Sequence, residues 1–287
     1  MNAPSPTKTV LITGGTSGLG LETARTLAHQ ALEIVLTARD GDRAESTARS
    51  IRQETGNNWV HGLPLDLASF QSIRSFTDGL LRRFPGLGGV VANAGILRSR
   101  YEESSDGIEL NLAVNHLGHF LMLNRLMPAL RHPNGTRIVL VGSDAHKRGR
   151  FDPESPTSRD GYRWLDAYAS SKLALTTFGL ALARRLEGTG NTVNLIHPGL
   201  SNTGIWPSET WGDRVFSSLV RLFAAPAART APGIVRLATA PDLDGITGRY
   251  YEKDQEMPPL PWALDPESQR RVWEWSEQVT GETFMVA

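Results

Sequence analysis

The sequence of 287 residues contains no cysteine. This absence excludes disulfide bonds, thiolate metal sites and cysteine nucleophiles. Net charge is also absent, because 30 Lys and Arg residues balance 30 Asp and Glu residues, so no global charge attracts nucleic acid or an anionic membrane. No run approaches the roughly 18 consecutive apolar residues of a membrane-spanning helix, and residues 1–7 lack the apolar stretch of a signal peptide. We therefore expect a cytoplasmic protein with no membrane anchor and no nucleic-acid partner.

Strand-like and helical segments alternate along most of the chain. Short β-branched runs, such as residues 9–13, 33–37 and 137–141, are separated by stretches with apolar residues at helical spacing. This alternation predicts an α/β fold, a doubly wound parallel sheet of about seven strands with helices on both faces. We expect a single domain over residues 1–287. Its expected parts are a core over about residues 8–252, an apolar excursion over about residues 200–228 and a C-terminal extension over about residues 253–287.

A glycine-rich turn stands between the first expected strand and the first expected helix. It reads Gly14-Gly-Thr-Ser-Gly-Leu-Gly20, and the helix follows over about residues 19–31. Glycines let backbone amides approach a pyrophosphate closely, and a helix N-terminus favours its negative charge. In this context the turn predicts dinucleotide binding by a Rossmann-type fold, and the alternative is a plain tight turn.

The end of the second expected strand carries a cation, in the stretch Thr37-Ala38-Arg39-Asp40. A carboxylate at this point would hold the ribose hydroxyls of NAD, whereas a cation suits the additional phosphate of NADP. Arg39 therefore favours NADP(H), unless the side chain is merely solvated. Asp40 leaves two further alternatives open, because it could pair with Arg39 or reach the ribose itself.

Tyr168 and Lys172 place a phenol and an ammonium group four residues apart in a segment expected to be helical. Such residues share one face of a helix. A nearby cation favours the ionised form of a phenol, so the pair could act as a general acid and base near neutral pH. The alternative is an ordinary pair of residues on a helix surface. Only further motifs elsewhere in the sequence can favour the catalytic interpretation over it.

Seven signals in the same order make the chain resemble a short-chain dehydrogenase/reductase. They are the glycine turn, Asn93-Ala94-Gly95, Asn115, Ser143, Tyr168, Lys172 and Pro198-Gly199. Three further stretches resemble the retinol-dehydrogenase-like branch of that family, namely residues 106–109, 114–120 and 270–276. The resemblance covers nearly the whole chain.

The resemblance implies roles for four catalytic residues. Tyr168 would protonate a carbonyl oxygen or accept the proton of an alcohol, and Lys172 would lower the tyrosine pKa and hold the nicotinamide ribose. Ser143 would hydrogen-bond the substrate oxygen, and Asn115 would hold a water molecule that connects Lys172 to solvent. Ser143 and Tyr168 lie twenty-five residues apart, which is wider than in many members of the family.

The turn, Arg39 and the resemblance together imply a set of cofactor-binding residues. The set is Gly14, Thr16, Ser17, Gly18, Leu19, Gly20, Arg39, Asp66, Leu67, Asn93, Ala94, Gly95, Tyr168, Lys172, Pro198, Gly199 and Thr203. Thr16 stands where relatives that use NADP sometimes carry a basic residue. Arg39 is therefore the main candidate for binding the additional phosphate.

The histidines are expected to be structural or solvated rather than catalytic. His116 and His119 lie on an expected long helix without carboxylate or cysteine at ligand spacing, so we expect no metal site. His197 precedes the Pro-Gly turn and is expected to be structural. His146 belongs to a local basic loop that is expected to be solvated, although it could meet the cofactor or an acidic substrate.

The C-terminal extension ends in an expected helix that begins near Asp265. Its expected buried stripe consists of Val272, Trp275 and Val279. The resemblance suggests a homodimer or homotetramer built from the two long helices over residues 107–130 and 168–186. The extension could block part of that surface, so whether it acts as a lid or an interface element stays open.

We expect an NADP(H)-dependent oxidoreductase that interconverts a ketone or aldehyde and an alcohol on a largely apolar small molecule. Polyketides, terpenoids, steroids and retinoid-like compounds of secondary metabolism fit the apolar excursion, which is expected on the substrate side. One alternative is reduction of an enone C=C bond by the same residues. Another is a non-catalytic regulator that senses NADPH, although a sensor needs only the nucleotide-binding half.

Overall fold

A computed structural model describes residues 8–130, 132–154, 157–200 and 224–284. Its sheet has the order β3-β2-β1-β4-β5-β6-β7-β8, parallel throughout except for the antiparallel pair β7 and β8. The strands are β1 (Thr9–Ile12), β2 (Glu33–Ala38), β3 (Val60–Pro64), β4 (Gly89–Ala92), β5 (Arg137–Val141), β6 (Thr192–His197), β7 (Tyr250–Glu252) and β8 (Gln255–Glu256). The α/β prediction is confirmed, and the described residues add an eighth, two-residue strand to the seven expected.

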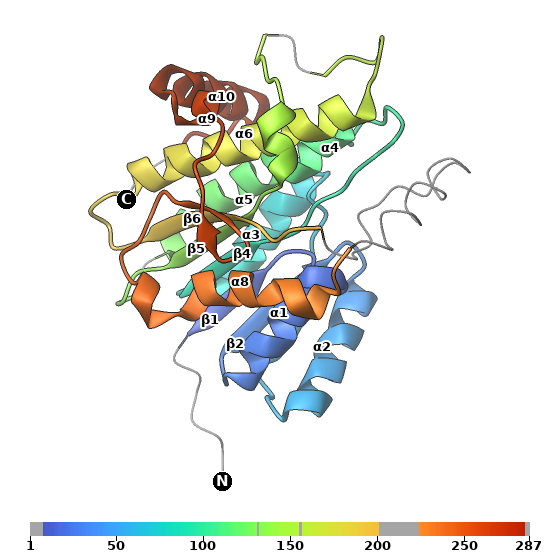
Figure 1. Ribbon diagram of the computed structural model, residues 1–287. Helices are drawn as coiled ribbons and strands as arrows, with labels where there is room; N and C mark the ends of the chain where they lie inside the picture. Colours follow the sequence, from blue (N-terminus) through green and yellow to red (C-terminus); the bar gives the residue numbers. More distant parts are fainter. Residues whose placement is uncertain (1–7, 131, 155–156, 201–223, 285–287) are drawn as a thin grey trace.

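Helices cover both faces of this sheet (Figure 1). They are α1 (Gly18–His29), α2 (Gly41–Thr55), α3 (Phe70–Arg83), α4 (Leu110–Leu112), η1 (Ala113–Leu117), α5 (Gly118–Leu126), η2 (Met127–Ala129), η3 (Asp144–Arg148), α6 (Trp164–Arg185), α8 (Ala227–Thr239), η4 (Pro241–Leu243), α9 (Pro261–Leu264) and α10 (Pro266–Thr280). Helices α1, α2 and α8 bury one face, whereas α3, α5 and α6 bury the other.

The strands are apolar on both sides because each face packs against helices. In β1, Leu11 belongs to the core under α3, α5 and α6, whereas Val10 and Ile12 belong to the opposite core. Strand β1 pairs with β2 on one side and with β4 on the other, so the chain order reverses at this point. The carboxyl ends of β1 and β4 therefore border a crevice of the kind that binds ligands in open α/β sheets.

The expected long helix over residues 107–130 is interrupted. The structure begins it at Leu110, inserts the π-helical turn η1 and ends it with the 3₁₀ turn η2. A π-helical turn inserts one residue into the hydrogen-bond ladder and changes the direction of the side chains around it. Sequence periodicity could not show this insertion, and it concerns the segment that carries Asn115.

Beyond β8, the helices α9 and α10 of the C-terminal extension pack on the outer side of α6, away from the sheet (Figure 1). Trp273 is 2% exposed and lies edge-on to Phe120, with ring centroids 5.3 Å apart. The expected stripe is buried at Val272 and only partly buried at Trp275 and Val279, which still pack against the core. It misses Trp273, Ser276 and Thr280, which are buried. Buried hydroxyls are tolerated on this face because Ser276 and Thr280 donate hydrogen bonds to carbonyls of their own helix.

The expected apolar excursion lies mostly outside the described residues, which resume before α8. Within the described ranges, no helix combines the length and hydropathy needed to cross a bilayer.

Candidate active site

The glycine turn at the end of β1 is tightly packed. Gly14 has a φ of +66°, and a Cβ added at Gly20 would lie 2.3 Å from the Gly14 carbonyl oxygen. The Asn93 side chain supports the turn from β4, because its Nδ2 donates to the carbonyl oxygens of Thr13 (2.9 Å) and Gly14 (3.3 Å). Glycine is therefore required at Gly20 so that α1 can approach the turn.

The N-terminus of α1 is open to an acceptor from outside the helix. Ser17 occupies the capping position, yet its side chain accepts no hydrogen bond from the first turn, and that turn contains no acidic residue. The first backbone N–H groups of a helix have no partner within the helix and carry the positive end of its dipole. This end of α1 thus has the donors and the polarity that a phosphate group needs.

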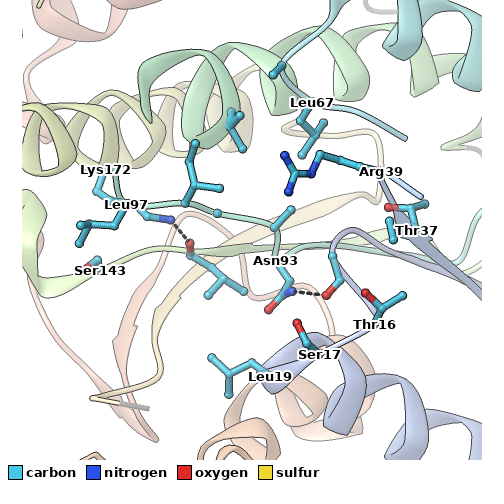
Figure 2. Close-up of a pocket in the computed structure, with 18 of the residues that line it drawn as sticks. Thr16, Ser17, Leu19, Thr37, Arg39, Leu67, Asn93, Leu97, Ser143 and Lys172 are labelled. Atoms are coloured by element: carbon cyan, nitrogen blue, oxygen red, sulfur yellow. Dashed lines mark hydrogen bonds between the residues drawn. The ribbon is translucent and has the colours of Figure 1, made fainter. Parts of the chain in front are cut away.

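Two arginines border the same crevice at the end of β2. Arg39 and Arg43 both line the cavity, and Figure 2 shows Arg39 extending from the strand end towards Leu67. Asp40 caps α2, because its Oδ1 accepts from the amides of Asp42 (2.9 Å) and Arg43 (3.1 Å). Within the part of the chain that the structure describes, Arg39 forms no ion pair with a carboxylate, and Asp40 does not pair with it.

One cavity of about 420 Å³ joins the N-terminus of α1 and the end of β2 to the Tyr168 and Lys172 pair. The predicted residues that line it are Gly14, Thr16, Ser17, Leu19, Arg39, Asp66, Leu67, Asn93, Ala94, Gly95, Ser143, Tyr168, Lys172, Pro198 and Gly199. Gly18, Gly20 and Asn115 do not line it, and Thr203 lies outside the described residues. In Figure 2, Lys172 and Ser143 lie at one end of the pocket, and Arg39 and Thr16 lie at the other.

Lys172 is buried at the inner end of the cavity. Its side chain comes from α6, and its Nζ donates to the carbonyl oxygen of Val141 at 3.1 Å (Figure 2). Burial lowers the pKa of Lys172 to about 8, because the charged form loses hydration. The ammonium group lies 6.0 Å from the centre of the Tyr168 ring.

Burial raises the pKa of Tyr168, and a hydrogen bond from the Ser143 hydroxyl opposes that rise. Burial is the larger of these two causes, and the lowering of the tyrosine pKa by Lys172 stays a prediction. Ser143 caps η3, where its Oγ accepts from the amide of Ala145 at 3.2 Å. Its hydroxyl proton is therefore left for the tyrosine oxygen.

Two histidines differ from their sequence interpretations. His146 is fully buried rather than solvated. Its Nδ1 donates to the carbonyl oxygen of Ser143 (2.7 Å), and its Nε2 accepts from the amide of Leu260 (3.2 Å). The C-terminal extension therefore contacts the segment that carries Ser143. His197 lines the cavity at the end of β6, so its position is not only structural.

Asn115 lies in η1, and its side chain faces the protein interior. Its Oδ1 accepts from the amide of Ile96 (2.8 Å), and its Nδ2 donates to the carbonyl oxygen of Ile96 (3.0 Å) and to Ser171 Oγ (3.0 Å). The side chain thus connects the loop after β4 to the helix that carries Lys172. The water-holding role stays a prediction.

Sequence reasoning missed several residues that line the cavity. Besides Arg43, Arg98 and His197, they include an apolar group formed by Ile96, Leu97, Leu110, Val114 and Leu200. The first two directly follow the Asn-Ala-Gly stretch, and Leu110 and Val114 are four residues apart on one helix face. These two signals were available in the sequence.

A family model described as short chain dehydrogenase matches residues 8–211. The chain belongs to the short-chain dehydrogenase family. Retinol dehydrogenase 14 of Mus musculus is 37% identical, with the alignment covering 96% of this chain and 86% of the relative. Polyprenol dehydrogenase of Mus musculus is 39% identical, covering 97% and 85% respectively. The predicted membership of the retinol-dehydrogenase-like branch is thereby confirmed.

Solved structures agree with this fold. The crystal structure of an uncharacterized protein from Mycobacterium paratuberculosis has a TM-score of 0.78 and 30% identity, covering 98% of this chain and 96% of that one. A short-chain dehydrogenase from Burkholderia cenocepacia, solved in complex with NADP, has a TM-score of 0.67 and 27% identity, covering 88% and 98%. This short-chain dehydrogenase is therefore an oxidoreductase of a family that uses nicotinamide cofactors.

Proposed function

We propose that this short-chain dehydrogenase uses NADP(H) to interconvert a ketone or aldehyde and an alcohol on a largely apolar small molecule. One observation supports this proposal above the others. A single cavity runs from Arg39 at the end of β2 and Arg43 in the first turn of α2, past the glycine turn, to Ser143, Tyr168 and Lys172. Nucleotide-binding and proton-transfer groups therefore border one continuous space.

The residues at the first end fit a dinucleotide with an additional phosphate. The packed turn brings backbone close to the cavity, and α1 offers uncapped N–H donors. Arg39 and Arg43 would hold the additional phosphate, because guanidinium groups bind phosphate through paired donors. Asp40 uses one carboxylate oxygen to cap α2, which does not favour a role in binding the ribose.

At the second end, the cofactor would supply or accept a hydride. Tyr168 would give its hydroxyl proton to the carbonyl oxygen during reduction and would take a proton from the alcohol during oxidation. Ser143 would hydrogen-bond the same substrate oxygen and fix its position. The raised pKa of Tyr168 keeps the phenol protonated, which is the form that reduction requires. The same residues catalyse both directions, and we propose reduction because NADP(H) is the expected cofactor.

Apolar residues that line the same cavity as Tyr168 support an apolar substrate. They are Ile96, Leu97, Leu110, Val114 and Leu200, and the neighbouring cation Arg98, which also lines the cavity, is paired with Glu102. The relatives named above carry the names of two isoprenoid alcohols, retinol and polyprenol. We therefore propose an isoprenoid aldehyde or alcohol as the first substrate class to test.

The test of turnover is reduction of all-trans-retinal and farnesal with NADPH, followed by product identification. Retinol or farnesol as the product is expected. Tyr168→Phe should abolish turnover and leave NADPH affinity within about twofold, because only the transferable proton is removed. A product in which a C=C bond is reduced would indicate an enone reductase instead. If the protein binds NADPH tightly but oxidises none of it with any of a broad panel of carbonyl compounds, the result would favour a non-catalytic regulator that senses NADPH.

Cofactor preference has its own test. The ratio of kcat/KM for NADPH to that for NADH should exceed one in the wild type. In Arg39→Ala it should fall by about 30-fold, as expected for loss of a charge-assisted hydrogen bond of about 2 kcal/mol. Arg43→Ala should lower the same ratio, and Arg49→Ala on the outer part of α2 is the matched control. An unchanged ratio in both cavity variants would contradict the role given to these arginines.

A further inference from the structure

His119 is buried beside the active site and uses both nitrogens of its ring. It lies in the first turn of α5 and is 0% exposed. Its Nε2 lies 3.1 Å from Thr13 Oγ1, and its Nδ1 lies 3.3 Å from the carbonyl oxygen of Asn115. The mechanism proposed above does not use this imidazole.

The hydrogen bonds around Thr13 determine where the protons lie. Thr13 Oγ1 accepts from the backbone amides of Asn93 (2.9 Å) and Ala94 (2.9 Å), so its own proton is donated to His119 Nε2. The remaining ring proton is then on Nδ1, which donates to the carbonyl oxygen of Asn115. Burial lowers the pKa of His119 to about 4, so the ring is neutral at neutral pH.

This chain of hydrogen bonds joins the nucleotide end to the catalytic end. Thr13 directly precedes the glycine turn, and Asn93 and Ala94 line the cavity at the end of β4. Asn115 lies in the π-helical turn η1, and its side chain continues the chain to Ile96 and to α6. A π-helical turn is less favourable than an α-helical one, so it persists where surrounding contacts hold it.

We propose that His119 is a positioning residue. Through its two hydrogen bonds it fixes the position of the Asn115 peptide relative to the ends of β1 and β4. Nucleotide binding at these strand ends is thereby transmitted to η1. The inference rests on the proposed function, because it takes the strand ends as the nucleotide site. His119 touches neither the cavity nor the reacting atoms, so it acts through Thr13 and Asn115.

His116 provides a matched control from the same segment. It is also 0% exposed, yet its Nε2 hydrogen-bonds Ser276 Oγ of α10 at 2.7 Å, on the side away from the cavity. Replacing either histidine removes a buried imidazole and should lower the free energy of unfolding. Only replacement of His119 should disturb the nucleotide site.

The test compares NADPH affinity and amide hydrogen exchange over residues 110–120. In the wild type and in His116→Phe, NADPH should slow this exchange. In His119→Phe the slowing should be lost, and NADPH should bind about tenfold more weakly, because Thr13 and Asn115 lose buried partners. His119→Gln keeps an acceptor for Thr13, so it should bind NADPH within about twofold of the wild type while still losing the slowing over η1.

Two results would overturn the inference, and they are distinguishable. If the His119 variants behave like His116→Phe in both measurements, His119 has only a structural role and the proposed function stands. If the wild type binds neither NADPH nor NADH, the proposed function fails, and the inference fails with it. Urea unfolding of each variant shows whether it is folded under the conditions of the assay.

Discussion

Gly20→Ala tests whether the close packing of α1 on the glycine turn forms the nucleotide site. The added Cβ would lie 2.3 Å from the Gly14 carbonyl oxygen and 2.6 Å from Asn93 Nδ2, whereas ordinary contacts begin at 3.4 Å. The nearest atom belongs to the backbone, so α1 has to move by about 1 Å. Overpacking of this kind lowers the free energy of unfolding by about 1–3 kcal/mol, and the higher helix propensity of alanine raises it by about 1 kcal/mol. We expect a net loss of about 1 kcal/mol.

The effect on binding should exceed the effect on stability. The N-terminus of α1 and the Asn93 side chain both contact the turn, so NADPH should bind at least about tenfold more weakly. Fluorescence titration with NADPH and urea unfolding measure the two quantities. Gly79→Ala in α3 is the control, because its nearest neighbour would be 4.0 Å away, and it should raise stability by about 0.5–1 kcal/mol. Wild-type affinity in Gly20→Ala would refute the reasoning.

Three further predictions concern Lys172, the C-terminal helix and Asp40. Lys172→Met should abolish turnover yet raise the free energy of unfolding at pH 7 by about 2 kcal/mol. Burying the charged ammonium group, which lowers its pKa from 10.5 to about 8, costs the folded wild type about 3 kcal/mol of stability, and the variant loses about 1 kcal/mol with the hydrogen bond to Val141. This gain is complete below pH about 8 and disappears towards pH 10.5, so equal stability at pH 7 in urea unfolding would contradict it. Trp273→Ala should cost about 4 kcal/mol in urea unfolding and Trp275→Ala clearly less, and the reverse order would contradict the buried face assigned to α10. Asp40→Asn should keep both stability and the NADPH to NADH ratio of kcat/KM, because asparagine also caps helices, and a changed ratio would show that the carboxylate contacts the ribose.

Local sequence patterns were sufficient for the fold class and for most of the site. Parallel strands place all their carboxyl ends at one edge of the sheet, so residues at strand ends converge whatever their separation in the chain. Asn93, Ser143 and Pro198 follow three different strands and line one cavity for this reason. The order of the motifs therefore predicted which residues would meet.

Tertiary packing decided which polar groups are buried and what they contact. The sequence predicted a solvated His146 and a buried Trp275, whereas the structure buries His146 beneath the C-terminal extension and buries Trp273 more deeply than Trp275. The helical period alone does not determine which neighbouring residues of α10 are buried, because burial depends on the aromatic side chains of α5 and α6 that contact α10. The π-helical turn and the hydrogen bond between Thr13 and His119, which lie about a hundred residues apart in sequence, are likewise features that no local pattern predicts. The sequence by itself determined the sheet and the ends of its strands, and long-range contacts determined how the catalytic helix is held against them.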